Sequence, residues 1–146
     1  MNADAERALA FEVGGVAFAL PLADVREVAE IGELHAVPTL PREIVSVANH
    51  RGDALPVVSA PALLEVGDAG AAREVLVIGG RGDEPGRMGL PVDRVLGLAR
   101  APRSRRDPSG VAEERATLDG RELLVLDAAR LIERAEKAIV RSRRRP

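Results

Sequence analysis

The chain has 146 residues, of which 46% are hydrophobic and 30% charged, with a net charge of −2. This composition is typical of one folded domain, or of two very small ones that share a core. The charge balance gives no general attraction to nucleic acid or anionic lipid, and no apolar run approaches the roughly 20 residues that span a bilayer. No cysteine is present, and residues 1–7 have no apolar signal-peptide core. We therefore expect a cytoplasmic protein without membrane insertion.

Aromatic residues are scarce: two Phe, no Trp and no Tyr. The core must therefore consist of Val, Leu, Ile and Ala. Aromatic platforms on which single-stranded nucleic acid or sugar rings stack are excluded.

Short apolar runs separated by turn residues predict strands through the first half. We expect strands over residues 9–13, 16–20, from Val25 onward, 44–49 and 55–58. Gly14-Gly15 and Arg51-Gly52-Asp53 form hairpin turns. A short helix is expected over 60–64 with Ser59 as its N-cap, followed by a linker over 66–72.

The same pattern begins again in the second half. We expect strands over residues 75–78, 88–92, 95–100, 112–118 and 123–126. A helix follows from Ala128 to about Val140, because Asp127 is a good N-cap and arginines at the other end suit the helix dipole.

The two halves are related by an internal repeat. Residues 52–64 align with residues 120–132 at an offset of 68. Two copies of a unit of about 60 residues predict two small barrels, each of which closes its own edges. The expected organisation is all-β with a C-terminal helix: a first barrel over 8–66, a second over 73–133, and a helix end with a basic tail over 134–146.

The sequence gives little support for catalytic activity. The histidines, His35 and His50, have no second His or Cys at ligand spacing. Gly79-Gly80-Arg81-Gly82 lacks the Lys-Ser/Thr of a phosphate loop, and no carboxylate pair is marked out for acid–base work. We predict no catalytic residue, no cofactor, no metal and no small-molecule substrate.

Two arginine clusters leave open an alternative of another class, a small nucleic-acid-binding β-barrel. A salt-dependent contact with phosphate would use them, although a solvated loop and a frayed helix end explain them as well. Nucleic acid is therefore an unlikely partner. The clusters comprise Arg100, Arg103, Arg105 and Arg106, and Arg141, Arg143, Arg144 and Arg145.

An ordered set of motifs resembles the CheW family of chemotaxis coupling proteins. The central motif is Asn49-His50-Arg51-Gly52, followed by Leu55-Pro56-Val57-Val58. Flanking matches extend the likeness over about residues 9 to 133. They are Phe18 to Leu22 with Val25 to Val28, Met88 to Gly97, and Asp119 to Leu131.

The resemblance implies two SH3-like five-stranded β-barrels and a non-catalytic adaptor. Such an adaptor links the cytoplasmic signalling tip of a chemoreceptor (a methyl-accepting chemotaxis protein) to the regulatory domain of a CheA-type histidine kinase, within cytoplasmic receptor arrays. The resemblance places the partner-binding residues at Val25, Glu27, Asn49, Arg51, Gly52, Val92 and Asp93.

Three positions depart from the family pattern: His50 stands where Leu is usual, Ser59 where Asp is usual, and Ser46 where Gly is common. These departures favour a second alternative beside the full coupling protein. It is a divergent accessory CheW-like protein that binds the receptor but not the kinase.

Overall fold

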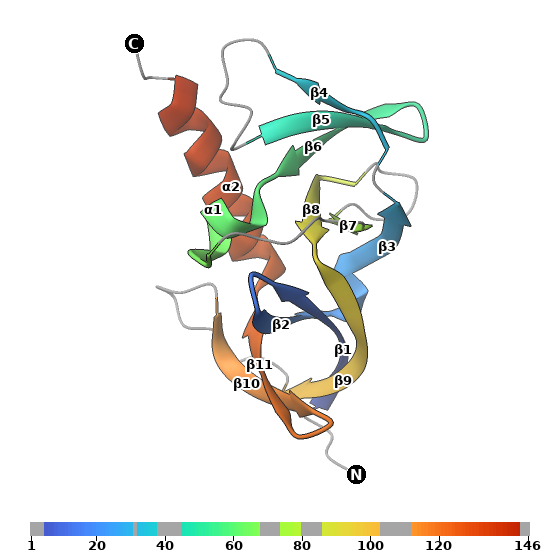
Figure 1. Cartoon of the computed structure of the whole chain (residues 1–146), viewed down its shortest axis with the longest axis vertical. Helices are drawn as coiled ribbons and strands as arrows, with labels where there is room; N and C mark the ends of the chain where they lie inside the picture. Colours follow the sequence, from blue (N-terminus) through green and yellow to red (C-terminus); the bar gives the residue numbers. More distant parts are fainter. Residues whose placement is uncertain are drawn as a thin grey trace.

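The computed structural model describes residues 5–30, 32–37, 45–67, 74–79, 86–102 and 112–143. Their strands form two sheets, one in each half of the view in Figure 1, and a long helix lies alongside. The elements are β1 (Ala5–Val13), β2 (Val16–Pro21), η1 (Leu22–Asp24), β3 (Val25–Glu30), β4 (Leu34–Ala36), β5 (Val45–His50), β6 (Asp53–Val58), α1 (Ala60–Leu64), β7 (Glu74–Ile78), β8 (Met88–Val92), β9 (Arg94–Pro102), β10 (Ala112–Leu118), β11 (Arg121–Leu126) and α2 (Ala128–Arg143).

The first sheet is a closed barrel with the strand order β1-β2-β11-β10-β9. Its pairings are antiparallel except between β2 and β11, where Phe18 lies opposite Leu124 in a parallel pair. Closure leaves no open sheet edge in this barrel.

The second sheet has six strands in the order β3-β7-β8-β6-β5-β4, so that β3 and β4 are its edges. It also contains one parallel pair, β6 with β8, through Val57 and Gly89. The expected fold class, mostly β with SH3-like barrels and a C-terminal helix, is confirmed. This sheet has one strand more than the five expected for each barrel.

The expected division into residues 8–66 and 73–133 does not coincide with the sheets. β1 and β2, from the first half, join β9 to β11, whereas β7 and β8, from the second half, join β3 to β6. The physical reason is pairing between the halves: β1 pairs with β9 and β2 with β11 in the barrel, and β3 with β7 and β6 with β8 in the other sheet, so each sheet needs strands from both halves. The two copies of the repeat therefore form matched hairpins and do not form one barrel each.

Small side chains fill the closed barrel. Successive residues of a strand point to opposite faces, and seven of the nine buried residues on the inner face of this barrel are alanines. The buried interior residues are Ala8, Ala10, Ala17, Ala19, Ala99, Ala101, Ala116, Leu123 and Val125. A wall of methyl groups lets the five strands close tightly without a void.

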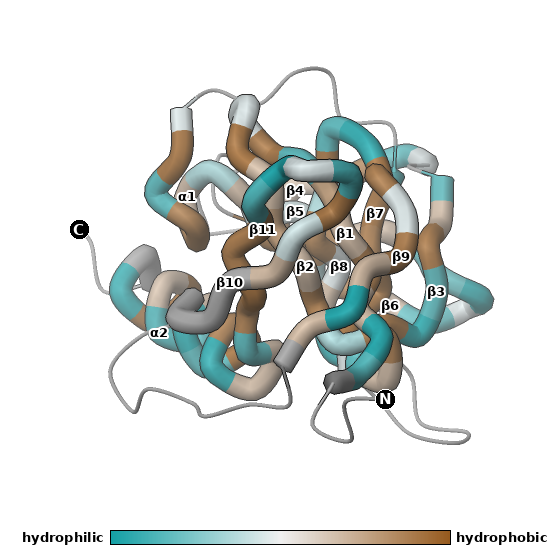
Figure 2. Tube along the Cα trace, turned by 90° about the horizontal axis from the view of Figure 1, so that it is seen from below, coloured by the Kyte–Doolittle hydropathy of each residue, from teal (hydrophilic) through white to brown (hydrophobic). Residues whose placement is uncertain are grey.

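The large side chains of β1 and β2 point the other way, out of the barrel. Leu9, Phe11, Val13, Phe18 and Leu20 join the main core, which also contains residues of β7, β8 and α2. The rings of Phe11 and Phe18 stack with centroids 5.9 Å apart. Hydrophobic stretches accordingly run through the middle of the molecule in Figure 2, around β1, β2 and β8. The main core therefore lies between the two sheets.

Helix α2 ties the sheets together. It begins as expected, because the Asp127 carboxylate accepts hydrogen bonds from the backbone N–H groups of Ala129 (2.9 Å) and Arg130 (3.3 Å). From the end of β11 it runs alongside α1 in the other half of the molecule. There the Arg134 guanidinium donates to the carbonyl oxygen of Leu63 at 3.0 Å. The short helix α1 also has its expected cap, the Ser59 hydroxyl.

We predict that Phe11→Ala destabilises both sheets together, because Phe11 is fully buried in the core between them. Removing a buried phenyl ring costs about 3–5 kcal/mol of unfolding free energy. Urea denaturation should show one transition at a lower midpoint. Leu98→Ala is the control, because Leu98 is 44% exposed on β9. A biphasic transition, or equal losses in the two variants, would contradict a shared core.

Candidate functional site

Strand β3 lies at an edge of the second sheet and carries two of the predicted site residues. Its backbone bulges between Val25, which pairs with Ile78, and Glu27, which pairs with Val77. The bulge changes which face each side chain takes. Glu27 shares the face of Val77, and Val28 returns to the face of Val25, where it is 39% exposed. Val25 is half-buried against the main core.

The turn between β5 and β6 presents Arg51. Arg51 and Gly52 have φ angles of 52° and 87°, so the two-residue loop is a type I′ turn, which suits the strand twist. Glycine adopts this backbone freely, but for arginine it costs roughly 1–2 kcal/mol. The Asn49 side-chain oxygen accepts a hydrogen bond from the Gly52 N–H at 2.9 Å and stabilises the turn. The Arg51 side chain is 74% exposed.

A contact of three side chains, here called the Glu27 cluster, joins the β3 edge to this turn. The Nε2 atom of His50 hydrogen-bonds to Oε1 of Glu27, and Nη2 of Arg51 lies 2.6 Å from Oε2 of the same carboxylate. β3 and β5 are not neighbours in the sheet order, so the cluster connects strands that share no backbone ladder.

The cluster keeps Glu27 ionised. The hydrogen bond from His50 holds the pKa of Glu27 below its usual value, burial opposes this, and the charge of Arg51 adds to the lowering. The side chains of His50 and Glu27 are 15% and 25% exposed. Arg51 is the member that reaches solvent.

Val92 and Asp93 occupy structural positions. Val92 is fully buried in β8, two strands away from β3. The Asp93 carboxylate accepts a hydrogen bond from the Gly14 N–H at 2.9 Å, and the Asp93 N–H donates to the carbonyl oxygen of Glu12 at 2.9 Å. Asp93 therefore connects the β8–β9 bend to the β1–β2 turn.

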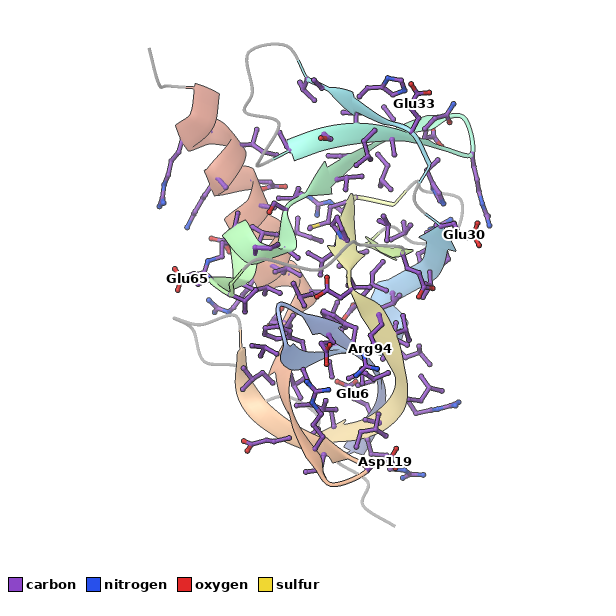
Figure 3. The ribbon with its side chains drawn as sticks, viewed as in Figure 1. Glu6, Glu30, Glu33, Glu65, Arg94 and Asp119 are labelled. Atoms are coloured by element: carbon purple, nitrogen blue, oxygen red, sulfur yellow. The ribbon has the colours of Figure 1, made fainter. Side chains whose placement is uncertain are left out.

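A second charged cluster lies beside Asp93, with Glu12 at its centre. The Glu12 carboxylate is 2.6 Å from Arg121 and 3.4 Å from Arg94. The hydrogen bond from Arg121 lowers the pKa of Glu12 against the opposing effect of burial, and Arg94 contributes further. Arg94 begins β9 near the centre of the molecule, where the two sheets meet (Figure 3). This cluster fastens β1, β9 and β11 to one another.

The structure thus brings together four of the seven predicted residues, namely Glu27, Asn49, Arg51 and Gly52. Val25 begins the strand that carries Glu27, two residues before it, and packs against the main core. Sequence reasoning singled out His50 as a departure from the family pattern, but did not pair it with Glu27. The signal was a polar residue at a usually apolar position, which implies a polar partner.

Within the described ranges, no group of three or more His, Asp or Glu side chains is arranged to hold a metal ion. No helix of that part of the chain is long and apolar enough to cross a membrane. Of the two arginine clusters, the side chains of Arg100 and Arg141 are described, and both are exposed. The other arginine side chains lie outside the described part.

Comparisons with known proteins agree with this architecture. Residues 7–136 match the CheW-like domain family. The chain belongs to this family. The crystal structure of the scaffolding protein TtCheW from Thermoanaerobacter tengcongensis superposes with a TM-score of 0.66 at 20% identity, covering 84% of each chain.

A curated relative is the protein FrzA of Myxococcus xanthus, which is 37% identical over 93 residues, or 63% of this chain. The chain spans 57% of the length of FrzA.

We predict that Asp93→Ala lowers the free energy of unfolding, because it leaves the Gly14 N–H without its acceptor. An unsatisfied, partly buried donor costs about 1–3 kcal/mol. The matched control is Asp93→Asn, which keeps an acceptor oxygen and should retain most of the stability. Unchanged thermal and urea unfolding of Asp93→Ala would instead assign this residue to partner contact alone.

Proposed function

We propose that the chain is a non-catalytic adaptor in chemosensory signalling. It holds the cytoplasmic signalling tip of a chemoreceptor and the regulatory domain of a CheA-type histidine kinase at the same time. The observation that carries this proposal is the Glu27 cluster at an exposed sheet edge, in a chain that belongs to the CheW-like family.

The Arg51 guanidinium is the charged anchor for the receptor tip. It is mostly exposed and uses one nitrogen for Glu27, which leaves further N–H donors in a fixed fork for carboxylates of a helical partner. Glycine, which has no β-carbon, would form this turn without the conformational strain that arginine introduces. Strained backbone of this kind is concentrated at functional sites, which favours a role for the arginine head group itself.

Strand β3 supplies the apolar part of the receptor surface. Val25 and Val28 share one face, and Val28 is among the few large apolar side chains of the described chain that are exposed. Interfaces gain most of their free energy from a desolvated apolar centre with charges around it. Val25 and Val28 provide such a centre on one face of the edge strand, and Glu27 with Arg51 lies across the strand on its other face.

The kinase domain binds elsewhere, on the closed barrel. The receptor residues all lie on the six-stranded sheet, so the barrel surface stays open to a second partner. The regulatory domain of the kinase has the same barrel fold in the family that this chain resembles, which suits end-to-end barrel docking. Leu98 on β9 is an exposed apolar side chain of this barrel.

A competition experiment tests the proposal. The protein is saturated with a receptor signalling-tip fragment, and the kinase regulatory domain is then titrated in while both complexes are monitored. We expect a ternary complex. Displacement of the receptor by the kinase would show that the sites overlap and would refute the scaffold. If the receptor fragment binds but the kinase domain does not, the chain is instead the accessory CheW-like protein that binds only the receptor.

We predict that Arg51→Glu weakens receptor-tip binding by tens-fold or more, because a charge-assisted contact is replaced by repulsion worth about 2 kcal/mol. Kinase binding should stay unchanged and the fold should stay intact, because Arg51 is 74% exposed. The matched control is Arg87→Glu, since Arg87 is 57% exposed and also pairs with a glutamate, Glu136, at 2.9 Å. Equal affinities in both variants would show that Arg51 serves only its own loop.

A further inference from the structure

We propose that His50 is a positioning residue that controls how available Arg51 is to a partner. When His50 is protonated, its imidazolium balances the negative charge of Glu27. The Arg51 guanidinium is then released to bind a carboxylate of the partner. The expected partner is an acidic helical surface bound more tightly at lower pH. The identity of this partner rests on the proposed function, whereas the coupling of His50 to Arg51 does not.

The geometry makes Glu27 a shared acceptor. One carboxylate oxygen faces His50 and the other faces Arg51. The Arg51 side chain is five times as exposed as that of His50, at 74% against 15%. His50 therefore acts on Glu27 from the inner side, and Arg51 is free to turn toward a ligand on the outer side.

The charge of the cluster depends on His50. With a neutral imidazole, the negative charge of Glu27 is balanced by Arg51. With an imidazolium, Glu27 is already balanced, and Arg51 contributes an uncompensated positive charge. Because the hydrogen bond from His50 lowers the pKa of Glu27, the carboxylate stays ionised as the solution is acidified toward pH ~6. The imidazole is the kind of side chain that ordinarily changes charge between about pH 5 and 8.

Other charged groups lie around the cluster. Arg26 acts on Glu27 from the same strand. Glu30 shares with His50 the wall of a cavity of about 40 Å³. Asp53 lies opposite His50 across the β5–β6 ladder. Carboxylates and guanidinium groups of these kinds differ from imidazole in that they do not normally switch charge near neutral pH.

A merely structural role for His50 would be to fasten the β3 edge to the turn by one hydrogen bond. That role predicts a loss of stability on substitution and no effect of pH on Arg51. The positioning role predicts that Arg51 responds to the protonation of His50. A pH profile therefore separates the two roles, and His50→Gln keeps a hydrogen-bond donor while removing the titration.

The direct test is NMR on the full chain from about pH 8 to about pH 6. The guanidinium Nε–H signal of Arg51 and the side-chain carboxyl carbon of Glu27 are followed together with the imidazole of His50. We expect all three to report one shared transition in the wild type and none at Arg51 in His50→Gln. An Arg51 signal that ignores the imidazole transition would overturn the proposal.

The second arm measures binding of a chemoreceptor signalling-tip fragment at the two ends of this pH range. The wild type should bind about two- to five-fold more tightly at the acidic end, as is typical of one exposed charge contact. His50→Gln should bind with no pH dependence. His35→Gln is the matched control, because His35 is the other histidine of the chain and is exposed on β4; it should keep the full dependence.

The outcomes separate the two proposals. If His50→Gln keeps the pH dependence of the wild type, or if His35→Gln removes it, the positioning role of His50 is wrong. If the fragment fails to bind at either pH while the NMR transition of Arg51 follows His50, the coupling stands and the proposed receptor function is wrong.

Discussion

The whole molecule depends on one constraint, that the β1–β2 hairpin is buried on both faces. Its inward side chains are alanines, which allow the barrel to close, and its outward side chains are Leu, Phe and Val, which form the main core with the second sheet. Along residues 8–11 and 17–20 the hairpin has no solvent side to tolerate polar residues. The two sheets therefore cannot separate without exposing the largest side chains of the chain, and α2 covers the same core from the side.

This constraint also positions the candidate site. Strand β3 follows the hairpin through the three residues of η1, and Val25 packs against the shared core. The first residue of β3 is thus held by the core between the sheets, and Glu27, two residues later, is held to the β5–β6 turn by the Glu27 cluster. An edge strand fastened at two points along its first half loses less freedom when it binds a partner, which reduces the ordering cost of binding.

Local features of the fold could be predicted from the sequence. The Gly14-Gly15 and Arg51-Gly52 turns and the caps at Ser59 and Asp127 depend on neighbouring residues, and each is where the pattern places it. The exchange of strands between the sheets could not be predicted. It rests on strand pairs between residues far apart in the chain, both antiparallel and parallel, which leave no mark on local periodicity.

The contrast between the two copies of the repeat shows what makes the site. Asp119-Gly120 forms the same turn as Arg51-Gly52, with φ angles of 51° and 79°. It lies at the far end of the closed barrel, where Figure 3 shows Asp119. Aspartate tolerates this backbone better than arginine does, so the second turn carries less strain. Only the first turn faces the edge strand that carries Glu27. The repeat therefore contains one turn geometry twice, and only the first copy is joined to an edge strand, through the carboxylate of Glu27 with His50 beside it.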